Sequence, residues 1–286
     1  MRKIVYFILV CFVILGLTTI QEQQDRFPIP TEKEIKEADK TVEQLAKDEV
    51  FSLPPTELAM FLWDILKKGR AEDFSYYDSN PTSLTEEQAK KPATILLHGY
   101  GTNQGEWLPL LKSASENNSG PIFTLQYPQQ SSREDLVKRI EQIKELYLKA
   151  GQEATRIQLV GHSLGGITSA DYAFDPDAWV PGTQVEKVIS IAGRLRNVEP
   201  PSKTPYYAYG YMLLPYVDEV WQKIEQNRGK VRLYAIAAQE DWLLPFESVL
   251  VADNPENNIV IPDAGHALIG RKKEAIQQVL EWMNTP

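Results

Sequence analysis

The chain has 286 residues, of which 43% are apolar and 24% charged, so it can bury a sizeable core. This composition excludes a disordered segment and a polytopic membrane protein. Thirty Lys and Arg against 39 Asp and Glu give a net charge of −9, which would repel phosphate backbones, so we expect no nucleic acid partner. The single cysteine, Cys11, excludes an internal disulfide framework, a thiolate zinc cluster and an iron–sulfur site.

The chain begins with an apolar run from Ile4 to Ile20, which Arg2 and Lys3 precede. As a helix this run would span about 25 Å, slightly less than the roughly 30 Å hydrocarbon core of a bilayer. Residues 1–20 are therefore either an uncleaved membrane anchor or a signal peptide, and the lack of alanine in the run favours the anchor. The basic residues predict a cytoplasmic N-terminus and an extracytoplasmic main body, which would be secreted if the segment were cleaved.

Residues 21–90 are charged, rich in helix formers and interrupted by prolines, and we interpret them as a linker and helical segment. Thr56 can cap a helix whose apolar residues run from Leu58 to Leu66 and which ends near Gly69. We expect the apolar face of this helix to dock on the main domain.

In residues 91–286, short apolar runs rich in β-branched residues alternate with helical patterns. The clearest helix extends from Leu136 to Tyr147, with a Ser131–Glu134 capping box before it and Gly151 after it. This alternation predicts an α/β fold, a mainly parallel sheet of about six strands with helices on both faces and reactive groups at the carboxyl ends of the strands. The predicted strands are Ala93–Leu97, Ile122–Gln126, Ile157–Val160, Val185–Ala192, Val231–Ala237 and Asn258–Ile261.

A G-x-S-x-G sequence, Gly161-His162-Ser163-Leu164-Gly165, directly follows the third predicted strand, and a helix-compatible stretch follows it. A serine at a sharp strand-to-helix turn has an exposed hydroxyl, and the tight turn requires small residues around it. The position between a strand and a helix indicates a nucleophilic serine, Ser163, rather than an ordinary glycine-rich turn.

These residues resemble the nucleophile elbow of the α/β-hydrolase superfamily, particularly its lipase and esterase branch. The resemblance extends from Lys91 to the C-terminus. In that family a histidine–glycine pair follows the first core strand, as His98 and Gly99 do here. The resemblance implies an oxyanion hole made of the backbone amides of Tyr100 and Leu164, with the ring of His98 supporting the loop. The full fold has two more strands at its start, which are either missing here or lie between Phe74 and Lys90.

The family carries its catalytic histidine on a loop after the last strand and its acid after the preceding strand. His266 follows the last predicted strand, and the other two histidines lie in the elbow and in the oxyanion segment. Asp241 lies after the strand Val231–Ala237 and is the expected acid, with Glu240 as the alternative; Asp263 is too close to His266 in sequence. The order Ser163, Asp241, His266 is the α/β-hydrolase order, and this chemistry requires no metal or organic cofactor.

Substrate identity would be encoded between the fourth and fifth strands, where Gly193 to Gly229 is longer than a simple helix crossing needs, with residues 194–222 as the candidate for a small cap. This segment includes Tyr206, Tyr209, Tyr211 and Tyr216, and two interpretations are open: a small cap over the active site, or a helix packed on the sheet. Trp107 and Trp242 are likewise either core or pocket residues.

The sequence thus predicts a serine carboxylester hydrolase that acts on lipid or other apolar acyl esters. The alternatives are an acyltransferase, amidase or peptidase on the same triad, and an inactive membrane-anchored binding protein. The sequence gives no indication of oligomeric state.

Overall fold

The computed structural model describes residues 81–99, 104–116, 120–125, 133–198, 214–241, 243–251 and 255–285, all of which belong to one structural unit of the chain. The predicted anchor, the Thr56 helix and residues 199–213 of the tyrosine-rich segment lie outside these ranges. Within these ranges, no helix combines the length and hydropathy that a membrane crossing requires.

Six parallel strands form one sheet in the order β2-β1-β3-β4-β5-β6. Each strand forms at one of the predicted apolar runs, so the predicted parallel sheet is confirmed. Because all the strands run in the same direction, their carboxyl ends meet at one edge of the sheet. The strands are β1 (Ala93–Leu97), β2 (Ile122–Leu125), β3 (Thr155–His162), β4 (Thr183–Ile191), β5 (Arg232–Ala238) and β6 (Asn258–Ile261).

Some strand ends differ from the prediction. β3 begins at Thr155, earlier than predicted, because Thr155 pairs with Thr183 of β4, and it ends at His162 beside Ile191. β4 ends at Ile191 because Ala192 has a φ of 48° and leaves the extended conformation. Strand pairing and backbone angles set these ends, and neither can be predicted from the order of apolar residues.

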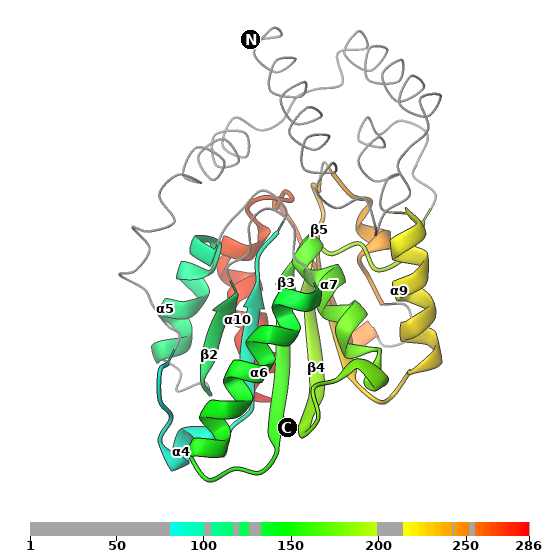
Figure 1. Cartoon of the computed structure of the whole chain (residues 1–286). Coiled ribbons are helices and arrows are strands. Elements are labelled where there is room, and N and C mark those ends of the chain that lie inside the picture. Colours follow the sequence, from blue (N-terminus) through cyan, green and yellow to red (C-terminus); the bar gives the residue numbers. More distant parts are fainter. Residues whose placement is uncertain are drawn as a thin grey trace, which may run out of the picture. The chain divides into compact units, whose positions relative to one another are not determined.

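Helices cover both faces of the sheet, as predicted (Figure 1). One face packs against α6 (Arg133–Lys149), α7 (Leu164–Ala173) and α9 (Leu214–Gln226), and the other against α5 (Leu108–Glu116) and α10 (Lys273–Asn284). Successive strand residues point to opposite faces, so Ile95 and Leu97 contact the first layer and Leu96 the second. Two apolar layers therefore bury the strands on both sides.

The interval Phe74–Lys90, one of the two alternatives for the first two strands of the full fold, holds helix α4 (Glu86–Ala89) and no strand over its described residues 81–90. Thr85 and Gln88 form a capping box that the sequence analysis missed, with Gln88 N donating to Thr85 Oγ1 at 3.2 Å. Ser131 of the predicted capping box lies outside the described residues. Short 3₁₀ helices are η2 (Gln104–Trp107), η3 (Pro176–Ala178), η4 (Phe246–Ser248), η5 (Pro255–Asn257) and η6 (Ile269–Arg271).

Helix α9 is tied to α7 and α6 by a largely buried ionic cluster. Asp171 of α7, whose side chain is 6% exposed, accepts from Lys223 of α9 at 2.5 Å and lies 3.5 Å from the Arg133 guanidinium. Val217 and Val220 of α9 are fully buried, and Tyr216 packs against the same core. From Tyr216 onward, the segment predicted as a cap or packed helix is thus a helix packed on the core.

Helix α10 is held to the sheet by a buried lysine on β4. Lys187 has no exposed surface, and its Nζ donates to the carbonyls of Trp282 at 2.8 Å and Thr285 at 2.6 Å. Burial, assisted by the nearby Arg232 charge, lowers the pKa of Lys187 to about 8. The ammonium lies at the carbonyl end of the helix, where a positive charge is favourable.

Strand β6 lies at the edge of the sheet and pairs only with β5. It has four residues, of which Asn258, Ile259 and Val260 are partly exposed and Ile261 is buried. The loop that carries His266 begins directly after this strand.

Candidate active site

Ser163 lies at the turn between β3 and α7, at the carboxyl edge of the sheet. Its φ of 52° and ψ of −119° belong to a strained conformation for a residue with a side chain. The turn is so tight that a Cβ on Gly161 would lie 2.2 Å from Gly165 O, and a Cβ on Gly165 would lie 2.3 Å from Leu97 O. Both positions therefore require glycine, as the elbow interpretation predicts.

The structure brings together the three predicted triad residues from three different strand ends. His266 Nε2 lies 2.9 Å from Ser163 Oγ, and His266 Nδ1 lies 2.8 Å from Asp241 Oδ2. The His266 side chain is 8% exposed and that of Asp241 is 1% exposed. Because a carboxylate only accepts hydrogen bonds, Nδ1 carries the hydrogen and Nε2 is free to accept the Ser163 proton.

Asp241 is fixed by its own backbone environment. Its Oδ1 accepts from Leu243 N at 2.8 Å and from Leu244 N at 2.9 Å, which leaves Oδ2 for His266. The alternative acid, Glu240, has an exposed side chain, and so has Asp263. The geometry therefore favours Asp241 as the partner of the histidine.

The predicted oxyanion segment lies beside the serine. A Cβ on Gly99 would lie 3.3 Å from Ser163 Cβ and 3.1 Å from His162 Nδ1, so the chain after β1 passes close to Ser163. Leu164 is the first residue of α7, where backbone amides lack intrahelical acceptors. Tyr100, whose amide is the other predicted donor, lies outside the described residues, as does Trp242. His98 is fully buried, with Nδ1 2.8 Å from Gly99 O.

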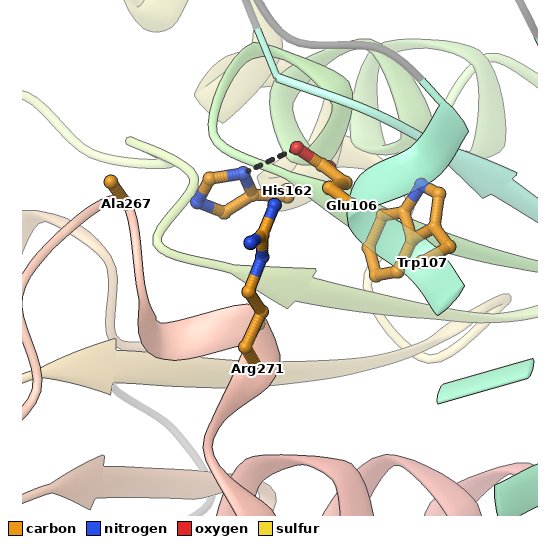
Figure 2. Close-up of a pocket in the computed structure, with 6 residues that line it drawn as sticks. Glu106, Trp107, His162, Ala267 and Arg271 are labelled. Atoms are coloured by element: carbon orange, nitrogen blue, oxygen red, sulfur yellow. Dashed lines mark ion pairs between the residues drawn. The ribbon is translucent and has the colours of Figure 1, made fainter. Parts of the chain in front are cut away.

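Two further residues, His162 and Glu106, lie next to the triad, and neither was expected from the sequence to have a role. His162 Nε2 lies 2.9 Å from the carbonyl oxygen of His266, and His162 Nδ1 lies 3.4 Å from Glu106 Oε2 (Figure 2). Trp107, beside Glu106, is 1% exposed and belongs to the core layer of α5 and α10. No sequence motif includes Glu106. Its position in η2, shortly after the first strand, is the only feature that suggests a place near the site.

The site can supply a nucleophile, a base and an orienting carboxylate without further groups. Among the described residues, no group of three His, Cys, Asp or Glu side chains could hold a metal ion. The arrangement is suited to attack on an electrophilic carbonyl carbon, with proton transfer through His266.

Residues 129–238 match the family described as the PGAP1-like alpha/beta domain. This match includes the elbow and the end of β5 but neither Asp241 nor His266. No curated protein matches the chain.

Among solved structures, the chain is similar to the mature form of the lipase BlEst2 from Bacillus licheniformis. The two share 13% identity with a TM-score of 0.51, over 72% of this chain and 97% of the lipase. The product of gene lin2722 from Listeria innocua and an esterase from Pyrobaculum calidifontis are each 15% identical, with a TM-score of 0.49 over 68% of this chain and 95% and 76% of theirs. At these identities the likeness to the lipase shows the fold, and the predicted α/β-hydrolase fold is confirmed.

Proposed function

We propose that this chain is a member of the α/β-hydrolase superfamily and a serine carboxylester hydrolase that acts on lipid or other apolar acyl esters. The observation that carries the proposal is the chain of two hydrogen bonds from Asp241 through His266 to Ser163, at 2.8 and 2.9 Å. A serine hydroxyl is a poor nucleophile unless a positioned base accepts its proton, and these distances meet that requirement.

In the proposed reaction, Ser163 Oγ attacks the acyl carbonyl carbon while His266 Nε2 takes the hydroxyl proton. The tetrahedral intermediate collapses, His266 returns the proton to the leaving alcohol, and an acyl-serine ester remains. Water, activated by the same nitrogen, then attacks this ester and releases the carboxylic acid. Asp241 remains ionised and stabilises the imidazolium that forms in each step.

The tyrosine-rich segment of the sequence supports the choice of apolar acyl esters, because aromatic side chains offer an apolar surface to an acyl chain. The lipase with the similar fold is named for this class of substrate. These two observations support a substrate class and no particular acyl length or head group.

The proposal is tested by fluorophosphonate labelling combined with hydrolysis of p-nitrophenyl esters of increasing chain length. We expect a single labelled residue, Ser163, and loss of both label and turnover in Ser163→Ala. Ser115→Ala, which removes an exposed hydroxyl on α5, serves as the matched control and should retain both. Labelling that persists in Ser163→Ala would contradict the assignment.

We further propose that residues 1–20 attach the protein to a membrane with its catalytic body outside the cytoplasm. The support is the apolar run between Ile4 and Ile20 and the basic residues before it. Fractionation of the full chain and of a variant lacking residues 1–20 tests this, since only the full chain should sediment with membranes. N-terminal sequencing that began near Gln21 would show a cleaved signal peptide instead.

A further inference from the structure

The imidazole of His162 has an oxygen acceptor facing each of its two nitrogens. Its side chain is 6% exposed, Nε2 lies 2.9 Å from the His266 carbonyl oxygen, and Nδ1 lies 3.4 Å from Glu106 Oε2. A ring nitrogen is attracted to a carbonyl or carboxylate oxygen only when it carries a hydrogen. The geometry therefore suits the doubly protonated, positively charged form of His162.

Glu106 connects this imidazole to the segment after β1. Its Oε1 accepts from Gly99 N at 3.3 Å while its Oε2 faces His162, and the carboxylate is 10% exposed. One line of contacts thus runs from Gly99 through Glu106 and His162 to the backbone of His266. It joins the predicted oxyanion segment, helix η2, the elbow and the loop that carries the base.

The surrounding charges favour a charged pair. Burial disfavours protonated His162, but the Glu106 carboxylate, the hydrogen bond to His266 O and the Asp241 charge outweigh burial and raise the pKa of His162. The His266 ring lies with its centroid 5.3 Å from that of His162. The guanidinium of Arg271 on η6 points toward the pair (Figure 2). Its positive charge disfavours protonation of His162.

A small cavity adjoins these side chains. It has a volume of about 10 Å³ and is lined by Glu106, His162 and Arg271, with Trp107, Ala267 and Gly270 completing its wall. A space of this size holds about one water molecule. The two side chains are only 6% and 10% exposed, so the pair is largely shielded from bulk solvent, where its attraction would be screened.

We propose that Glu106 and His162 form a buried charged pair that positions His266 and the Gly99 segment around Ser163. The inference rests on the proposed function, and it assigns both side chains a positioning role rather than a part in the chemistry. His162 holds the His266 main chain by its carbonyl, which limits the positions that the catalytic ring can take. Glu106 holds the Gly99 amide at the same time, so base and oxyanion segment are located by one ion pair.

The test is Glu106→Gln in the full-length protein. The amide oxygen still accepts from Gly99 N, but the NH₂ group then faces His162 Nδ1, so the variant removes the charge and replaces the acceptor for the Nδ1 hydrogen by a donor. We expect kcat for a p-nitrophenyl ester to fall roughly ten- to hundredfold, because misplacement of a catalytic group by about 1 Å has effects of that size. KM should change by less than about threefold, since no contact to substrate is lost. Glu274→Gln, an exposed position on α10, is the matched control and should match wild type.

A positioning role through charge also predicts a change in pH dependence that a merely structural role would not give. His162 in Glu106→Gln should lose its proton at lower pH, so the alkaline limb of the kcat profile should move to lower pH. The chain has only three histidines, which makes ¹⁵N NMR of the imidazole rings a direct measure of the His162 titration. In His162→Gln, whose amide still donates to the His266 carbonyl, this alkaline limb should be absent.

An unchanged kcat and pH profile in folded Glu106→Gln would overturn the proposal, and so would an alkaline limb that persists in His162→Gln. If Glu106→Gln does not fold, His162→Gln alone decides by the same limb. The rate of fluorophosphonate labelling at Ser163 reports on positioning without an ester substrate. Wild type that is labelled rapidly but hydrolyses no ester would therefore contradict the proposed function and leave this inference to be judged by the labelling rates.

Discussion

Replacing Asp241 with asparagine should disable the site by reversing one hydrogen bond. Oδ1 of Asp241 accepts from two backbone amides, Leu243 N at 2.8 Å and Leu244 N at 2.9 Å. An asparagine that turned its NH₂ toward these amides would place donors against donors and lose two hydrogen bonds, each at a cost of about 1 to 3 kcal/mol. The amide oxygen therefore remains there, and the NH₂ group faces His266 Nδ1.

That orientation forces the wrong tautomer on the histidine. Nδ1 must accept from the amide, so the hydrogen moves to Nε2, which then cannot take the Ser163 proton. The expected loss in kcat is on the order of 10⁴-fold, which corresponds to about 5 kcal/mol of transition-state stabilisation. Ester turnover and the rate of fluorophosphonate labelling measure this loss, with the melting temperature as a check on folding.

Glu240→Gln is the matched control, because it changes a neighbouring acid whose side chain is exposed. It should retain wild-type kcat. The reasoning would be refuted by Asp241→Asn that is folded and within about tenfold of wild type, since the tautomer argument predicts a far larger loss. A large loss in Glu240→Gln alone would transfer the acid role to Glu240.

Three further predictions concern the scaffold. Because the pKa of Lys187 is about 8 in the folded state against an ordinary 10.5, the unfolded state binds more protons between these values, so stability rises with pH. Chemical denaturation should show that the difference in free energy of unfolding between wild type and Lys187→Met shifts in favour of wild type by about 2.5 kcal/mol from pH 7 to pH 10. A difference that stayed constant with pH would contradict this. In a urea titration, Asp171→Asn should lower the free energy of unfolding by about 3 kcal/mol, because it removes the carboxylate that faces Lys223 in a buried cluster. The control Glu219→Gln changes a side chain that is 62% exposed and should lower it by less than about 1 kcal/mol. Gly165→Ala should abolish labelling of Ser163 even where the protein folds, since its Cβ would lie 2.3 Å from a backbone oxygen of β1; normal labelling would show that the turn can widen.

The sheet could be predicted from the sequence because strands buried on both faces appear as continuous apolar runs. β1 and β6 have the predicted bounds, since polar residues or turns adjoin both ends of their runs. The start of β3 could not be predicted, because Thr155 is extended by pairing with Thr183 rather than by any hydrophobic pattern. The burial of Lys187 was equally hidden, since a lysine in a strand is ordinarily exposed.

The neighbourhood of Ser163, Asp241 and His266 followed from the resemblance to the α/β-hydrolase family, together with the rule that parallel strands bring their carboxyl ends together. Their catalytic roles stay a prediction until the variants are measured. The pair of Glu106 and His162 could not be predicted, because it joins residues 56 positions apart in sequence and neither side chain belongs to a spacing pattern. The oxyanion role of Tyr100 also stays a prediction, since that residue lies outside the described ranges.

The edge position of β6 gives the parts of the site unequal local stability. Ser163 follows β3, which is paired on both sides within the sheet, whereas His266 follows a four-residue strand paired only with β5. Hydrogen bonds at a partly exposed edge open more often than those in the interior, so β6 should show faster amide exchange than β3. Fraying of this strand would carry His266 away from Ser163 while the remaining sheet stayed folded. Heat or denaturant should accordingly abolish the proposed activity by partial opening, before the cooperative loss of the core.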